Sequence, residues 1–348
     1  MNSESGAKSE VRKIQLTGGS TYIVSLPKSW VTQHGLEARD EVRIEWRPSG
    51  TLRVIADASS LVKQREVKIN CNEIPDHMIF DHLVASYLSG AHRIIISSST
   101  EFSRFQRKIF REFVKSTRGL EITNDQGQEI EMISLLNPSE MPLFSSINRM
   151  YLLISRQIRD FSEVLLGGDA EILEESSEIE NEVDALRLLL ERQAGQILES
   201  ASIEDSLGTS RWEAAELCKL VRTLERMGDH SFALCDLAKS YKVPNLLNMD
   251  SLPISIIPVW QTSIKLLVSN LRNRNFSEIH EAKSQLITAQ KDLLQYEEVL
   301  RASDVDISDA LFLDRVSESL RRICAYSINM AEILMNIQTH RDSVEVYS

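Results

Sequence analysis

The sequence has little of what marks secreted, membrane-spanning or zinc-binding proteins. No run approaches the roughly 18 consecutive apolar residues that a membrane helix needs, and the first twenty residues contain no apolar signal segment. The four cysteines include no CxxC pair, so they indicate neither a disulfide framework nor a zinc ribbon. We therefore expect a cytoplasmic protein that has no membrane insertion and whose thiols are buried.

Glycine, proline and aromatic residues are also scarce. The 348 residues include 13 Gly and 8 Pro, and aromatic residues make up 6%. This Leu- and Glu-rich balance favours helices and excludes collagen-like and all-β folds. The length allows two or three domains of roughly 150 residues each. We expect a multidomain α+β protein.

Basic charge is scarce as well, because the formal net charge is −12. Residues 11–55 nevertheless contain seven Lys or Arg against four Asp or Glu, a local balance of +3 that leaves −15 for the remainder. A polyanion is therefore expected to contact this first segment, whereas the acidic remainder would suit cations or protein partners.

We divide the N-terminal part into a disordered tail, residues 1–9, and a head, residues 10–57. In the head, VRKIQL and TYIVSL alternate apolar and polar residues around a TGGS turn, which predicts two short strands. Pro27 opens a short helix that ends near Gly35, and EVRIEW and TLRVIA predict two more strands. Because a β-β-α-β-β core of this size is marginal alone, dimerisation is expected.

A middle module, residues 64–138, alternates between strand and helix signals in the order β-α-β-α-β-β. Right-handed crossovers would pack both helices on one sheet, giving a small two-layer α/β module. No Gly-rich phosphate loop follows any of its strands, so nucleotide binding is not indicated. We expect a spacer or a ligand-sensing module.

A helical bundle is predicted over residues 144–341, where apolar residues recur at steps of three and four, as at Ile179, Val183 and Leu186. Loop signals divide it into six helices. Residues 225–236 and 321–332 align without gaps at an offset of 96. The bundle is therefore expected to be a duplicated three-helix unit, with repeats at about 144–243 and 250–341.

Five acidic residues of the first repeat have helical spacings that suit cation binding: Glu180, Asp184, Glu225, Asp229 and Asp236. The last three lie within about 40° of one another on a helix at 100° per residue. The first two repeat the ExxxD spacing, so two helices could enclose a hard cation with oxygen ligands. Alternatively, Arg222 and Arg226 form ordinary surface ion pairs with these acids.

The motif ERMGDHSFALCD in a duplicated three-helix bundle resembles the PhoU family of phosphate-uptake regulators over roughly residues 144–339. In that family the acidic motifs bind iron or other divalent metal clusters. The resemblance implies a divalent or iron metal cluster at Glu225 and Asp229, with Glu180 and Asp184 as companions.

The second repeat departs from this acidic pattern. Arg321 and Ala325 stand where the acids belong, and Thr288 replaces the first companion acid, so that only Asp292 matches. We therefore expect one metal site in each chain, in the first repeat.

The head, with TGGSTYIVSLPKSWV, resembles the AbrB/MazE/SpoVT swapped-hairpin domain, in which two chains interleave their strands into one DNA-binding β-barrel. The combination of the two domains is similar to PhoU-like regulators of archaea. In the AbrB-type family the first strand and its loop meet DNA. This implies DNA-binding residues Arg12, Lys13, Gln15, Thr17, Ser20, Thr21, Ser25 and Lys28. Alternatively, the head serves only for dimerisation.

These features predict a cytoplasmic, homodimeric, non-enzymatic regulator of phosphate uptake, with a DNA-binding head and a metal-binding sensory bundle. Two alternatives stay open. One is an adaptor that inhibits phosphate transporter components or a sensor kinase by protein contact, without DNA. The other is a metal-dependent phosphohydrolase, although no HExxH or other catalytic motif occurs.

Overall fold

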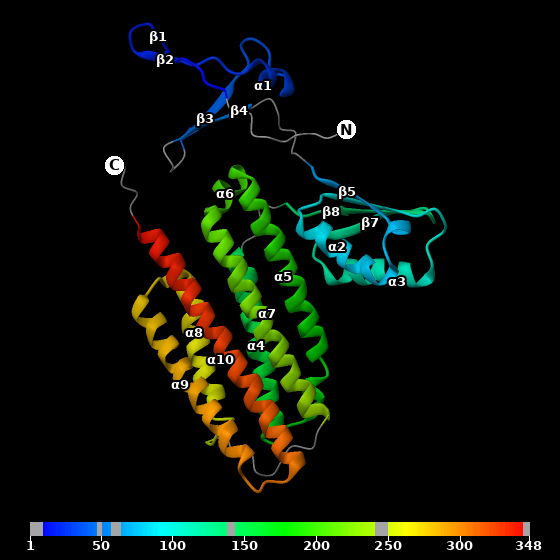
Figure 1. Cartoon of the computed structure of the whole chain (residues 1–348), viewed down its shortest axis with the longest axis vertical. Helices are drawn as coiled ribbons and strands as arrows, with labels where there is room; N and C mark the ends of the chain where they lie inside the picture. Colours follow the sequence, from blue (N-terminus) through cyan, green and yellow to red (C-terminus); the bar gives the residue numbers. More distant parts are fainter. Residues whose placement is uncertain (1–9, 47–50, 57–63, 138–142, 241–249, 344–348) are drawn as a thin grey trace. The chain divides into compact units, whose positions relative to one another are not determined.

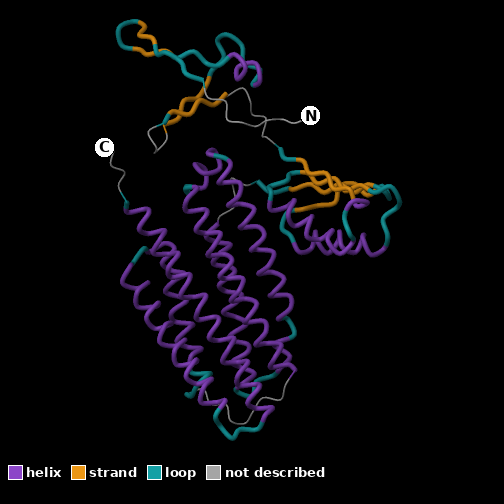
Figure 2. Tube along the Cα trace, viewed as in Figure 1, coloured by secondary structure: helices purple, strands orange, loops and turns teal. Residues whose placement is uncertain are grey.

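The computed structural model describes residues 10–46, 51–56, 64–137, 143–240 and 250–343, and the chain divides into two compact units at residue 64 (Figure 1). The tail expected to be disordered, residues 1–9, lies outside the described residues. Among the described residues, strands occur in the head and the middle module, and residues 143–240 and 250–343 form helices and their connecting loops (Figure 2). This arrangement agrees with the predicted α+β fold class.

The described part of the head follows the predicted β-β-α-β-β order. Its elements are β1 (Gln15–Thr17), β2 (Thr21–Ile23), α1 (Lys28–Gln33), β3 (Val42–Trp46) and β4 (Leu52–Ala56). The β1–β2 turn passes through Gly18 and Gly19, whose φ angles of 62° and 81° are left-handed and favour glycine. The described strands of one chain pair as two separate antiparallel hairpins and do not close into a barrel.

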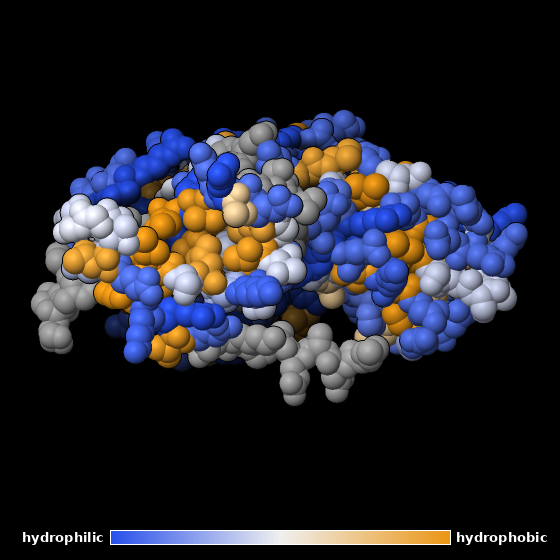
Figure 3. All heavy atoms as spheres, turned by 90° about the horizontal axis from the view of Figure 1, so that it is seen from above, coloured by the Kyte–Doolittle hydropathy of each residue, from blue (hydrophilic) through white to orange (hydrophobic). Residues whose placement is uncertain are grey.

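One copy of the head does not bury its own apolar residues. Among its described side chains only that of Ala56 is buried. Leu16 and Tyr22, which are paired across β1 and β2, are 59% and 68% exposed. Figure 3, which colours residues by hydropathy, shows several hydrophobic patches on one face of the chain. A chain in water does not leave such hairpins uncovered without a free-energy cost, so the head lacks a core of its own.

The middle module has the predicted order of strands and helices. Its elements are β5 (Glu66–Asn70), α2 (Ile79–Leu88), β6 (Arg93–Ser97), α3 (Arg104–Ser116), β7 (Leu120–Asp125) and β8 (Glu129–Ser134). The sheet order is β5-β6-β8-β7, with β5 parallel to β6 and the other pairs antiparallel. Both helices cover one face of the sheet (Figure 1). Leu83, Tyr87, Phe110 and Phe113 fill the core between the layers.

The described part of the bundle contains the six long helices that the sequence predicts, together with a short α-helix that it does not predict and a 3-10 turn at Ala170–Leu173. The helices are α4 (Leu143–Leu165), α5 (Ser176–Glu199), α6 (Ala201–Leu207), α7 (Arg211–Ser240), α8 (Ile256–Asn273), α9 (Phe276–Arg301) and α10 (Ile307–Asp342). The short helix, α6, begins at the Ser200 N-cap and ends at Gly208, whose φ is 59°. A single apolar core runs through both repeats.

Helix α5 joins the middle module to the bundle. The buried guanidinium of Arg192 donates to the carbonyl oxygens of Tyr87 and Ala91, the latter at 2.8 Å from Nη2. The same group lies 4.7 Å from the centre of the Tyr87 ring. Arg192 therefore satisfies carbonyl groups at the end of α2, and the module and the first repeat share α5.

Candidate functional site

Helices α5 and α7 approach closely at Gly228, which stands between Glu225 and Asp229 in the motif on α7. A Cβ added at Gly228 would lie 3.1 Å from Cγ1 of Val183 on α5. This is shorter than the ordinary carbon–carbon contact of about 3.5–4.0 Å. The missing side chain therefore allows the two helices to meet where both carry their ExxxD pairs.

Four of the predicted acidic residues gather at this approach, and we call them the acidic cluster: Glu180 and Asp184 on α5, and Glu225 and Asp229 on α7. All four are half-buried. Burial is the largest cause that raises the pKa of each carboxyl, and the neighbouring carboxylates add to it for Glu180, Asp184 and Glu225. The cluster therefore holds acidic groups at a free-energy cost that a cation would offset.

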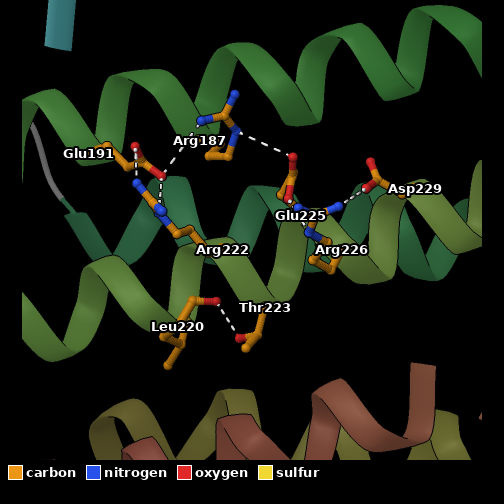
Figure 4. Close-up of polar contacts among 8 residues, drawn as sticks. All are labelled: Arg187, Glu191, Leu220, Arg222, Thr223, Glu225, Arg226 and Asp229. Carbon is orange, nitrogen blue, oxygen red and sulfur yellow. Dashed lines mark hydrogen bonds and ion pairs between the residues drawn. The ribbon is translucent and has the colours of Figure 1, made fainter. Parts of the chain in front are cut away.

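Two arginines neutralise the α7 half of the acidic cluster (Figure 4). Arg187 Nε lies 3.6 Å from Glu225 Oε1, and Arg226 Nη1 lies 3.5 Å from Asp229 Oδ2. Arg187 Nε is buried without a hydrogen-bond partner in the described structure, so its contact with Glu225 is only electrostatic. On the α5 half, Glu180 and Asp184 have no hydrogen bond or ion pair among the described residues, and Arg187 acts on Asp184 only through longer-range electrostatic attraction.

A second ion-pair group continues along the same two helices. Arg222 donates to both oxygens of Glu191, at 2.8 Å from Nε and 3.3 Å from Nη2, and Arg187 Nη1 lies 3.6 Å from the same carboxylate (Figure 4). Arg222 is therefore paired, as in the alternative of ordinary ion pairs, but with an acid outside the cluster. Sequence reasoning did not identify Arg187, although its place three residues after Asp184 was a usable signal.

The carboxylate oxygens of the acidic cluster are of the kind that binds a hard cation, but they are not arranged around a common point as metal ligands are. Carboxylate oxygens suit magnesium, manganese, iron and calcium. In the described part of the chain, no three Asp, Glu, His or Cys side chains converge as metal ligands do. Arg187 stands beside Glu225, so a bound cation would have to replace its charge. The cluster can therefore hold either arginine or metal.

The remaining predicted ligand, Asp236, is not brought to the acidic cluster. It follows Asp229 by seven residues, about 10 Å along a helix. It lines a separate groove of about 280 Å³ between α7 and α10, together with Arg315 and Glu318. Glu225, Asp229 and Asp236 do lie on one stripe of an isolated helix, but in the bundle Asp236 lines the groove toward α10.

Neither the second repeat nor His230 supplies further ligands to the acidic cluster. Thr288 and Asp292 line a groove between α8 and α9, and Arg321 pairs with Glu297 of α9. His230 faces α10, where its ring lies 5.9 Å from that of Tyr326.

The eight predicted DNA-binding residues are all exposed in the described head. Gln15 and Thr17 share one face of β1, and Thr21 lies opposite Thr17 on β2. The other face of this hairpin carries Leu16 and Tyr22. The hairpin therefore has a mainly polar face and an apolar face. Such a hairpin can bind a ligand with its polar face and pack against another chain with its apolar face.

Comparison with known proteins identifies two domains. The PhoU domain family matches residues 147–238, and the family of the MazE bacterial antitoxin, described as antidote-toxin recognition MazE, matches residues 15–60. Among curated proteins, none matches the chain by sequence. No described helix is long and apolar enough to cross a membrane.

Solved structures of PhoU proteins are similar to part of the chain. PhoU from Pseudomonas aeruginosa is 17% identical, with 57% of this chain and 96% of that chain covered and a TM-score of 0.44. The phosphate transport system regulatory protein PhoU from Streptococcus pneumoniae is 18% identical, with 59% and 96% covered and a TM-score of 0.45.

Proposed function

Because this chain joins an N-terminal MazE/AbrB-type domain to a PhoU domain, we propose that it is a DNA-binding regulator of phosphate uptake. The PhoU domain supports the regulation of phosphate uptake, and the MazE-type head is compatible with DNA binding. Both kinds of domain are regulatory and not enzymatic. In this proposal the protein is a homodimer. Its heads bind an operator, and its bundle responds to a cation or a partner protein.

The observation that carries the DNA-binding proposal is the polar face of the first hairpin. Gln15, Thr17 and Thr21 offer side chains that reach base edges, and Lys13 precedes them on the chain as a phosphate contact. The apolar face, with Leu16 and Tyr22, would be covered by the second copy. Dimerisation and DNA binding thus use opposite faces of one hairpin.

For the bundle we propose a divalent or iron cation at the acidic cluster. Glu180 and Asp184 offer carboxylates that have no ion pair within the described residues, and Glu225 and Asp229 offer oxygens that lie beside Arg187 and Arg226. A cation there would supply positive charge to half-buried acids. Its arrival would move Arg187, which also contacts Glu191, and α5 would carry that change toward the middle module.

The alternative is an adaptor that acts by protein contact without DNA. It is favoured by the acidic balance of −15 outside residues 11–55, which repels DNA and suits a basic partner. In that case the head would serve only to dimerise the chain.

One experiment separates the two functions. The purified full-length protein is mixed with sheared DNA of its own genome, the retained fragments are sequenced, and the metal content of the same sample is measured. The proposal predicts a recurring sequence near genes of phosphate transport and metal bound to the protein. Retention of no DNA, or of random fragments only, would favour the adaptor.

A further inference from the structure

Helix α3 of the middle module carries a row of cations. The row is not apparent from the net charge of long segments. Four of them we call the basic face: Arg104, Lys108, Arg111 and Lys115. They are spaced by four, three and four residues, which places them within about 60° of one another at 100° per residue. All four are exposed. The acidic balance of the chain therefore coexists with a strongly basic surface.

The opposite side of α3 is fixed against the module. Phe110 and Phe113 are fully buried and make edge-to-face contacts with Phe102 and Phe80, at centroid distances of 5.1 and 5.9 Å. A capping box formed by Ser103 and Gln106 holds the first turn. The basic face is therefore presented rigidly to solvent, and the apolar side of α3 is not free to enter a lipid bilayer.

The basic face is only partly compensated by acids within the described chain. Lys108 lies 3.5 Å from Glu112, both exposed, and Arg111 interacts electrostatically with Asp125, whereas Arg104 and Lys115 have no ion pair among the described residues. Like charges three or four residues apart destabilise a helix, and this row repeats that spacing three times. An external polyanion would offset this repulsion.

We propose that the basic face of α3 is a second DNA-binding surface of this chain, one that contacts the phosphate backbone. This inference rests on the proposed DNA binding and assigns a role to the middle module. The row spans 12 residues, whose 11 steps of 1.5 Å cover about 16 Å. That length covers about five phosphates of one strand at 3.4 Å spacing along the helix axis. Lys and Arg contacts of this kind strengthen binding without reading sequence.

A second DNA-binding surface would also add to the affinity of a weakly basic head in a chain whose overall charge is acidic. The balance of +3 over residues 11–55 provides few phosphate contacts. The four cations of the basic face would raise the number of Lys and Arg available for phosphate contact from seven, in residues 11–55, to eleven. They would add affinity and salt dependence equally for every sequence, leaving operator choice to the head.

The test compares two full-length variants of equal charge change. The first is Arg104→Gln, Lys108→Gln, Arg111→Gln and Lys115→Gln. The control, Arg159→Gln, Lys265→Gln, Arg272→Gln and Lys291→Gln, removes four exposed cations scattered over the bundle. Binding to the duplex selected from the genome and to a random duplex is measured by fluorescence anisotropy over a salt series, and circular dichroism checks that both variants are folded.

The proposal predicts that the α3 variant binds both duplexes at least tenfold more weakly, with the same ratio between them. Its slope of log affinity against log salt should fall by about 3 to 4, as expected for four lost phosphate contacts. The control should bind within twofold of wild type. Equal binding by the α3 variant and the control would overturn this inference alone, whereas failure of wild type to bind any duplex would overturn the proposed function as well. Phosphatidylserine vesicles serve as a second probe. Loss of vesicle binding by the α3 variant with unchanged DNA binding would reassign the face to a membrane surface.

Discussion

Arg321 of α10 donates to the carboxylate of Glu297 of α9, at 2.8 Å between Nε and Oε1, and Glu297 is only 2% exposed. Ser317 donates to the same oxygen at 3.2 Å. The position at which the first repeat carries Glu225 is thus filled in the second repeat by a guanidinium with an internal partner. In the second repeat this position therefore forms an ion pair between α9 and α10 and offers no metal ligand.

Removal of Arg321 should destabilise the bundle. Arg321→Ala leaves Glu297 buried without its main counter-charge, and we expect the free energy of unfolding to fall by about 3 kcal/mol. Arg301→Ala is the matched control, since Arg301 approaches the same carboxylate at 3.7 Å but is 63% exposed; its effect should be below about 1 kcal/mol. Urea unfolding followed by circular dichroism measures both. Equal effects would show that the buried pair has no special role.

Arg187 should compete with a cation at the acidic cluster. Arg187→Gln removes a positive charge beside Glu225, so the affinity for Mn²⁺ should rise by about tenfold or more. Arg222 still pairs with Glu191 in this variant. Calorimetric titration with Mn²⁺, using Arg159→Gln as an exposed control, gives the comparison. Unchanged or weaker Mn²⁺ binding by Arg187→Gln would contradict the proposed place of the metal.

Stability should depend on pH through the acidic cluster. The pKa values of its four carboxyls are raised by burial in the folded protein. The folded state therefore binds more protons than the unfolded state across the carboxyl range, and the free energy of unfolding falls as pH rises through that range.

The variant Glu180→Gln with Asp184→Asn removes part of this cost. It should be more stable than wild type at neutral pH by roughly 0.5 kcal/mol, and the gain should shrink as pH approaches about 4. Thermal unfolding at a series of pH values measures this, with exposed Glu163→Gln and Glu298→Gln as the control pair. A gain that is independent of pH would argue against coupled carboxyls.

The exposed apolar hairpin face should hold the dimer together. Leu16→Glu places a charge opposite Tyr22 on that face, and a chain without residues 1–57 lacks it altogether. Both should shift toward monomer in light scattering, whereas Ser29→Glu, an exposed change on α1, should not. A dimer of unchanged strength in the shortened chain would place the interface outside the head.

Periodicity and spacing predict the order of the long helices and of the strands, though not the short helix α6, and they predict the acidic pairs. The ExxxD spacing placed Glu180 beside Asp184 and Glu225 beside Asp229, and Gly228 stood in the same motif. Asp236 shows the limit of this reasoning, since spacing along one helix does not say which neighbour packs there. Arg192 was missed because its role depends on the end of α2, about one hundred residues earlier in the chain.

The basic face of α3 was missed for another reason. Charge was counted over long segments, and acids on the sheet cancel the cations of α3 in such a count. Only the helical period separates the two faces. The apolar residues of the head were correctly read as strands, but their exposure in one chain became visible only with the folded hairpins.

The two proposed contacts of the head differ in kind. Lys13 would contact phosphate and Gln15 a base edge, so Lys13→Ala should weaken binding to all sequences and lower the salt slope by about 1, with operator preference intact. Gln15→Ala should instead reduce the preference for operator over random DNA by about 1–3 kcal/mol.

Parallel anisotropy titrations of wild type, Lys13→Ala and Gln15→Ala against operator and random duplexes are the most direct test of DNA recognition by this chain. The account predicts two different losses, one uniform and salt-dependent, the other specific to the operator. Binding of both duplexes that is unaffected by either substitution would contradict it, and would show that the polar face of the first hairpin does not meet DNA.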